Sequence, residues 1–232
     1  MSLSSLVRRR ADLLAYIPLS VATTVADVLG RDRTHAATKV LLAPALAGGV
    51  LATREDRCPK RNGTLLVALT GSVVGDWYMY RASRSEGDVS RGFMRRGASA
   101  FGVQQAGLIG LLAHDGARPR PAPSAAVATT LAGLAVLDSD GGGPPDPVLT
   151  GYGLLLGTMS ALAMGDGGNP RTRPSVALGG ALFLVSDAAI IVGQRFAGSP
   201  RAQALSSAVI LSTYTAALGL LVRGLREEPA EG

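Results

Sequence analysis

The stretch VALTGSVVGDWYMY, residues 67–80, is an apolar run with a single carboxylate, Asp76, inside it. A second run, ALFLVSDAAIIV at residues 181–192, repeats the pattern with Asp187. A charged side chain at the centre of a bilayer costs about 2.5–3.5 kcal/mol on insertion scales, so it normally faces a protein interior or a wet cavity. The two aspartates are therefore candidates for a buried polar site, and a role in helix packing alone is the alternative.

Composition places these runs in a membrane protein. Of the 232 residues, 47% are hydrophobic and 17% are charged, and the mean hydropathy is +0.27. A soluble domain carries more charge, roughly a quarter of its residues. The charges cluster in short segments such as 54–63 and 81–96, with long uncharged stretches between them. This pattern is typical of a polytopic membrane protein, whose helices satisfy every backbone polar group internally.

The apolar runs predict an all-α bundle of about eight transmembrane helices, forming one integral membrane domain over residues 1–222. The runs cover residues 13–30, 38–53, 64–80, 97–113, 123–138, 148–165, 175–193 and 203–222. Several are shorter than the ~20 residues of a straight spanning helix, so interfacial residues complete them or the helices are tilted, bent or partly re-entrant. We expect the polar tail, residues 223–232, to be disordered.

The segment DSDGGGPPDP, residues 138–147, predicts a seam between two four-helix halves, 1–138 and 148–222, because Gly and Pro form turns. Asp76 and Asp187 lie in the third and seventh runs, each 12 residues past the start of its run. An even number of helices per half makes the repeats parallel, so both aspartates would lie about 18 Å into the bilayer. A pseudo-two-fold axis along the membrane normal could then bring them together.

The distribution of positive charge argues against nucleic-acid binding. The net charge is +6, but the basic residues are spread over many loops and no basic helix is interleaved with aromatic residues. Cys58 is alone, and both histidines lie near the ends of apolar runs, so we expect no metal site. The Arg-rich, Ala-rich and Gly-rich composition suggests a GC-rich bacterial genome, so we expect the protein in a bacterial cytoplasmic membrane. The loops on the side of the termini carry 13 basic residues against nine, which slightly favours cytoplasmic termini.

Other polar residues could line the same site as the aspartates. Lys39 could pair with an aspartate or extend to the interface. The adjacent glutamines at 104–105 lie in the middle of a run, where an unpaired amide is costly. Tyr214 is a phenol in a helix interior and needs a partner. Tyr80 and Tyr152 fit either such a site or an interfacial aromatic belt.

Four segments resemble, in order and spacing, the YhhN-like lysoplasmalogenase family. The family pattern is a Thr-Lys-Pro segment, an apolar run ending in Gly-Asp, a later segment ending in Ser-Asp, and a final helix with Tyr. The matching segments are THAATKVLLAP (34–44), GSVVGDWYMY (71–80), GALFLVSDAAIIVGQRF (180–196) and LSTYTAALGLL (211–221). The chain departs from this pattern at Val40, where the family has Pro, and at Gln105, where members often have His. A glutamine does not transfer protons as histidine does.

The resemblance implies an eight-helix membrane enzyme without a cofactor, which hydrolyses the vinyl-ether bond of lysoplasmalogens to a fatty aldehyde and a glycerophospho-alcohol. Such a reaction needs a neutral carboxylic acid to protonate the enol-ether carbon and a carboxylate nearby, and two aspartates sharing a desolvated site tend to split in this way. We therefore expect Asp76 and Asp187 to be the catalytic pair. The expected substrate-binding residues are Lys39, Gln105, Tyr214, Tyr80 and Ser186.

Two other readings of the same residues stay open. A small-solute or proton-coupled transporter also uses buried carboxylates and repeated halves. A non-catalytic lipid-binding member of the family would keep the site and lack the chemistry. Gln105, in place of the family's histidine, fits this alternative. The expected partners are a lysolipid or ether-lipid substrate and the surrounding membrane lipids. The sequence leaves the oligomeric state open.

Overall fold

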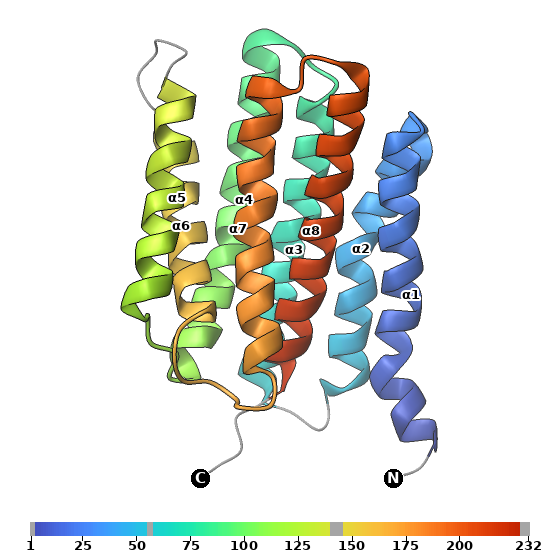
Figure 1. Cartoon of the computed structure of the whole chain (residues 1–232). Coiled ribbons are helices and arrows are strands. Elements are labelled where there is room, and N and C mark those ends of the chain that lie inside the picture. Colours follow the sequence, from blue (N-terminus) through green and yellow to red (C-terminus); the bar gives the residue numbers. More distant parts are fainter. Residues whose placement is uncertain (1–2, 55–57, 140–145, 228–232) are drawn as a thin grey trace.

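The computed structural model describes residues 3–54, 58–139 and 146–227, and over these residues it is a bundle of eight α-helices without a strand (Figure 1). This confirms the expected all-α membrane bundle. The helices are α1 Leu3–Val28, α2 Asp32–Ala52, α3 Pro59–Ala82, α4 Gly87–His114, α5 Pro121–Ser139, α6 Pro147–Ala163, α7 Arg173–Phe196 and α8 Pro200–Arg226.

The helices alternate in direction, so α1 begins and α8 ends at the same end of the bundle, the lower end in Figure 1. We call this the terminal end and the opposite end the far end. Helices α3, α4, α7 and α8 form the middle, with α1 and α2 on one side and α5 and α6 on the other. Both α3 and α7 run from the terminal end to the far end, as parallel repeats require. The duplication itself stays a prediction.

Proline and capping residues set where several helices begin. Proline occupies the first turn of α3, α5, α6 and α8, where its missing N–H has no intrahelical partner in any case. The Asp146 carboxylate caps α6 by accepting hydrogen bonds from the backbone N–H groups of Val148 at 2.9 Å and Leu149 at 3.4 Å. These polar and proline signals lie outside the apolar runs, so these four helices begin before the runs that marked them.

Several of the expected boundaries were wrong, with the largest differences at the starts of α1 and α4. Helix α1 begins at Leu3 rather than at residue 13, and α4 begins at Gly87 rather than at residue 97, so an arginine-rich segment continues the helix beyond its apolar part. Helix α8 continues to Arg226, so residues 223–226 are helical and not part of a disordered tail. The buried side chains of Leu225 and Arg226 pack this last turn into the bundle. The seam residues 140–145 and the tail residues 228–232 lie outside the described part of the chain.

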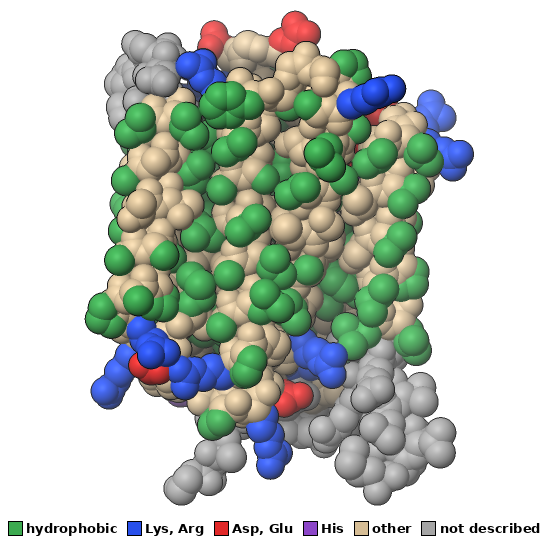
Figure 2. Space-filling view, in the orientation of Figure 1, with side chains coloured by type: hydrophobic (Ala, Val, Ile, Leu, Met, Phe, Trp, Pro, Cys, Tyr) green, Lys and Arg blue, Asp and Glu red, His purple; other side chains and the backbone are tan. Residues whose placement is uncertain are grey.

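The surface of the bundle fits a bilayer. Among the described residues, α2, α7 and α8 are long and apolar enough to cross a membrane, and shorter apolar stretches occupy Leu13–Val28, Pro121–Leu137 and Pro147–Ala163. Figure 2 shows one face of the molecule, with hydrophobic side chains over its middle and charged side chains gathered at the two ends. This distribution matches an apolar core bounded by polar headgroup layers.

Glycines let α3 and α4 approach closely beside Asp76. A Cβ atom at Gly71 would lie 2.6 Å from the Ala100 carbonyl oxygen, and one at Gly75 would lie 2.7 Å from the Phe101 ring. Small residues permit such close helix contacts in membrane proteins. The Phe101 ring consequently lies against α3 and packs edge-on against Tyr214, with ring centroids 6.0 Å apart.

A buried ion pair joins three elements at the terminal end. The Arg61 side chain of α3 is 5% exposed. Its Nη1 donates to Asp115 Oδ2 at 3.1 Å and to the Leu225 carbonyl oxygen at 2.7 Å, while its Nη2 pairs with Asp115 Oδ1. Because both partners of the pair are hydrogen-bonded, the cost of desolvating the two charges is offset. The contact fixes α3, the turn after α4 and the last turn of α8 to one another.

Candidate functional site

Asp76 lies on α3 in the far half of the bundle, and its side chain is 2% exposed. Its Oδ2 accepts a hydrogen bond of 2.8 Å from the Tyr214 hydroxyl of α8. Its Oδ1 lies 3.6 Å from Lys39 Nζ of α2. Three helices therefore contribute one polar side chain each to a single buried cluster. The sequence analysis left Lys39 open between pairing with an aspartate and extending to the interface, and expected Tyr214 to need a partner.

Aromatic rings hold this cluster in place. The Tyr214 ring is 6% exposed and packs edge-on against Phe101 of α4 and Phe183 of α7, with centroids 6.0 Å and 5.7 Å away. Edge-to-face pairs add specific geometry to apolar burial. The Tyr214 hydroxyl is thus aimed at the carboxylate by the packing of two other helices.

Tyr16 of α1 adds a second phenol near Asp76. Its side chain is buried, and its hydroxyl donates to the Thr215 backbone carbonyl at 2.7 Å. This acceptor is the residue next to Tyr214, whose hydroxyl binds Asp76. The sequence analysis did not single out Tyr16, because the partner of its hydroxyl lies on α8, far away in sequence.

Asp187 on α7 has a different set of neighbours. Its side chain is half-buried, and its carboxylate lies near the Tyr152 hydroxyl of α6. Among the described residues it has no ion-pair partner, whereas Asp76 has Lys39. Tyr152 also packs near Phe101, with centroids 6.4 Å apart, and the same Phe101 ring packs against Tyr214.

The two aspartates are therefore joined through tyrosines rather than in direct contact. Within the described residues the structure shows no hydrogen bond between them. The polar side chains instead form a series from α2 to α7 across the middle of the bundle. Lys39, Asp76 and Tyr214 form its first part, Tyr152 and Asp187 form its second part, and the Phe101 ring packs against both tyrosines.

Two buried amides lie on α4 beside this series. Gln104 is 1% exposed and Gln105 is fully buried, and neither amide makes a hydrogen bond within the described part of the chain. Gln105 lies near the Tyr152 hydroxyl without reaching standard hydrogen-bond geometry. A buried polar group without a partner costs about 1–3 kcal/mol, so these amides are suited to hold a polar ligand atom or a water molecule.

Two expected site residues lie elsewhere. The Tyr80 ring packs near His35 and under the Arg84 guanidinium, with the guanidinium 5.2 Å from its centroid. The Ser186 hydroxyl donates to the Ile210 carbonyl oxygen at 3.0 Å, so it ties α7 to α8. Within the described residues neither side chain contacts Asp76 or Asp187, although Tyr80 follows Asp76 by one helical turn and Ser186 is next to Asp187 in sequence.

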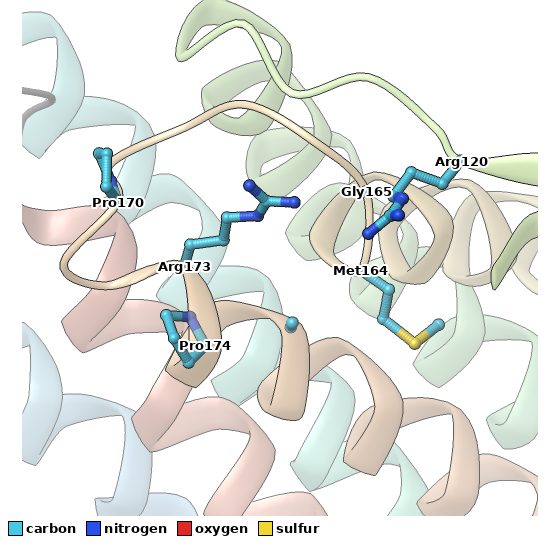
Figure 3. A pocket seen from close by; sticks show the side chains of 7 residues that line it. Arg120, Met164, Gly165, Pro170, Arg173 and Pro174 are labelled. Atoms are coloured by element: carbon cyan, nitrogen blue, oxygen red, sulfur yellow. The ribbon is translucent and has the colours of Figure 1, made fainter.

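Two hollows lie at the terminal end. The larger, shown in Figure 3, has a volume of about 430 Å³ and is bordered by α5, α6 and α7. A smaller one of about 20 Å³ lies beside Asp115. Neither is lined by Asp76 or Asp187. The described residues also contain no group of three or more His, Cys, Asp or Glu side chains arranged to hold a metal ion.

A carboxylate, lysine and tyrosine cluster, with a second carboxylate beyond it, inside a bundle of apolar helices defines an integral membrane protein with an intramembrane polar site. A model of the YhhN family matches residues 34–225, most of the chain, so the chain belongs to the YhhN family. The resemblance found in the sequence is thereby confirmed. No curated protein and no solved structure matches the chain.

Proposed function

We propose that the chain is a membrane hydrolase that cleaves the vinyl-ether bond of lysoplasmalogen-like lysolipids to a fatty aldehyde and a glycerophospho-alcohol. The observation that carries this proposal is the pair of intramembrane aspartates with unequal partners, in a chain of the YhhN family. The reaction needs one neutral acid and one carboxylate, and the two surroundings favour different charge states.

The partners of each aspartate support a division of roles. Asp76 has a cation, Lys39, and a hydrogen-bond donor, Tyr214, and both stabilise a carboxylate. Asp187 is half-buried and lies near the Tyr152 hydroxyl without a described ion-pair partner, and a partly desolvated carboxyl group without a counter-charge is more easily protonated than one beside a cation. We therefore assign Asp187 as the proton donor and Asp76 as the base.

In the first step, the Asp187 carboxyl group donates its proton to the vinyl carbon distal to the ether oxygen, and the double-bond electrons form the new C–H bond. The other vinyl carbon becomes an oxocarbenium centre. The negative charge at Asp76 stabilises this cation, since electrostatic stabilisation is strong in a water-poor site.

In the second step, water adds to the oxocarbenium carbon and gives its proton to Asp76, which produces a hemiacetal. The C–O bond to the glycerol then breaks, Asp76 returns its proton to the leaving oxygen, and the hemiacetal hydroxyl proton returns to Asp187. One water is consumed, and both aspartates regain their starting states. The unpartnered amides of Gln104 and Gln105 are suited to hold the attacking water.

We further propose that the chain resides in the bacterial cytoplasmic membrane with both termini cytoplasmic. The slight excess of basic residues in the loops at the terminal end supports this orientation. Asp76 would then lie nearer the opposite side of the membrane, because α3 ends at Ala82, shortly after it.

The test uses purified protein with a lysoplasmalogen and with its saturated alkyl-ether analogue, and follows aldehyde release by mass spectrometry. We expect aldehyde from the vinyl ether alone, because the saturated ether has no carbon that an acid can protonate to an oxocarbenium ion. Asp88→Asn serves as a control for the aspartate variants, since Asp88 is exposed in the first turn of α4.

Other outcomes separate the alternatives. Uptake of solute into proteoliposomes without chemical change would favour a transporter. Tight binding of the lysolipid without aldehyde release would favour a non-catalytic lipid-binding member, in line with glutamine at position 105. Either outcome overturns the proposed hydrolysis.

A further inference from the structure

The larger hollow at the terminal end has features of a binding site separate from the aspartates. It lies between the start of α5, the end of α6 and the start of α7 (Figure 3). The residues that line it are Arg120, Met164, Gly165, Pro170, Arg173, Pro174 and Ala177. The walls therefore combine two guanidinium groups with apolar side chains.

The two arginines share one carboxylate. Arg173 donates a hydrogen bond to Asp166, and Arg120 Nε lies 3.4 Å from the same carboxylate. The Arg120 and Arg173 side chains are 55% and 39% exposed, and in Figure 3 they extend toward each other across the hollow. Two guanidinium groups on one carboxylate leave an excess positive charge and several unused N–H donors.

The backbone fixes this arrangement. Arg118 and Asp166 exchange two backbone hydrogen bonds, of 2.7 Å and 2.8 Å, which join the loop before α5 to the loop after α6. A Cβ atom at Gly165 would lie 2.0 Å from the Arg118 carbonyl oxygen, so only glycine permits this approach. The shared carboxylate and both arginines are consequently held at a defined place at the end of the bundle.

The apolar side of the hollow continues onto lipid-facing helix surface. Met164 and Ala177 line it, and α5 beside it is mostly exposed, with Val127 and Leu134 as its buried hydrophobic residues. An acyl chain can lie along such a surface while its headgroup reaches the arginines. A free phosphate ester would use the arginines alone.

We propose that this hollow binds the phosphate of an anionic phospholipid, with Arg120 and Arg173 as hydrogen-bond donors. Guanidinium groups match phosphate oxygens geometrically, and basic pockets between transmembrane helices bind such headgroups. Asp166 competes with the phosphate for the same donors. This site does not depend on the proposed hydrolysis.

The experiment measures lipid retention by native mass spectrometry, and thermal stability, of the purified full chain in detergent. The added ligands are phosphatidylglycerol, phosphatidylcholine or glycerol 3-phosphate. We expect phosphatidylglycerol to remain bound and to raise the Tm, with little effect of the other two. The double variant Arg120→Gln/Arg173→Gln should weaken retention about tenfold or more, because two charge-assisted hydrogen bonds are lost. Arg171→Gln, an exposed arginine of the same loop that does not line the hollow, is the matched control.

The variant Asp166→Asn should change lipid retention in the direction opposite to the double variant, and it keeps the backbone hydrogen bonds between Arg118 and Asp166. It should tighten retention of phosphatidylglycerol, because the competing carboxylate is removed. Unchanged or weaker retention in Asp166→Asn, or retention in the double variant equal to that in Arg171→Gln, would overturn the proposal. Retention of phosphatidylcholine equal to that of phosphatidylglycerol would show that the site does not select an anionic headgroup. Full competition by glycerol 3-phosphate would show that the site does not need a lipid. Either result would overturn the proposal of an anionic phospholipid.

Discussion

Asp76 and Asp187 lie on helices that run in the same direction, α3 and α7, in the third position of each expected half. Both carboxylates face a tyrosine hydroxyl from another helix, Tyr214 for Asp76 and Tyr152 for Asp187. Only Asp76 also has a lysine, Lys39. Two sites with the same acidic group and a similar phenol can thus differ in charge, because a third helix supplies a cation to one of them and not to the other.

The largest expected effect is on the rate. Asp76→Asn and Asp187→Asn should each lower aldehyde release by about 100- to 10,000-fold, the usual contribution of a general acid or base. The measurement is single-turnover aldehyde release, with Asp88→Asn as the reference. A wild-type rate in either variant removes that aspartate from the mechanism.

Stability should separate the two aspartates. Asp76→Asn leaves the Lys39 ammonium group without its carboxylate, which costs about 3–5 kcal/mol when the pair is buried. Asp187→Asn removes no ion pair and should change the free energy of unfolding far less. The measurement is unfolding in SDS or urea without substrate. Equal losses in the two variants would contradict the described difference in partners.

A double variant sharpens this test. Lys39→Met/Asp76→Asn removes both charges, so it should be more stable than either single variant. A double variant that loses the sum of the two single losses would show that Lys39 and Asp76 do not interact.

Removal of the tyrosine hydroxyl should lower the free energy of unfolding more at Tyr214, which binds Asp76, than at Tyr152, which lies near Asp187. Tyr214→Phe removes a hydrogen bond to a charged group and should cost about 1.5–3 kcal/mol, while Tyr152→Phe should cost about 0.5–1.5 kcal/mol. Unfolding of both variants measures this difference. A larger loss in Tyr152→Phe would place the ionised carboxylate at Asp187 instead.

Gln105→Leu tests whether the buried Gln105 amide lacks a hydrogen-bond partner when no substrate is bound. We expect the free energy of unfolding to stay equal or to rise by up to about 1–3 kcal/mol, because an unsatisfied amide is removed. Aldehyde release should fall in the same variant. A clear loss of stability would instead show that an ordered water satisfies the amide in the resting protein.

A small effect is expected at an aspartate outside the membrane. At Asp146, a hydrogen bond from Arg95, followed by the bonds from the α6 backbone, lowers the pKa of the carboxyl group. Its contribution to stability is therefore present at neutral pH and is lost as the pH falls below the ordinary range of an aspartate and through the lowered pKa. Asp146→Ala should cost about 0.5–2 kcal/mol at pH 7, and less in acid. Unfolding at both pH values measures this; a pH-independent loss would contradict the role of the ionised cap.

The sequence allowed the helices and the buried acids to be predicted because both depend on short segments. Apolar runs located all eight helices, and a carboxylate inside such a run marked Asp76 and Asp187 directly. Their partners come from other helices, so spacing along the chain could not assign Tyr152 to Asp187 or choose between pairing and interfacial placement for Lys39. The helix ends could not be predicted from the apolar runs, because proline, capping residues and arginine-rich turns extend a helix without apolar side chains.

Arg61 shows the same limit in a charged segment. Its neighbours in sequence are polar, which indicated an exposed loop, yet the side chain is buried against Asp115 and the Leu225 carbonyl oxygen. Nothing in the local pattern distinguishes it from the exposed Lys60.

The bond between Arg61 and Leu225 also has a consequence for biosynthesis. The ribosome makes Arg61 and Asp115 before it adds Leu225, which follows Arg61 by 164 residues. During insertion, the Arg61 guanidinium therefore lacks one of its final acceptors until α8 has been made. The bundle closes around this group only when α8 arrives.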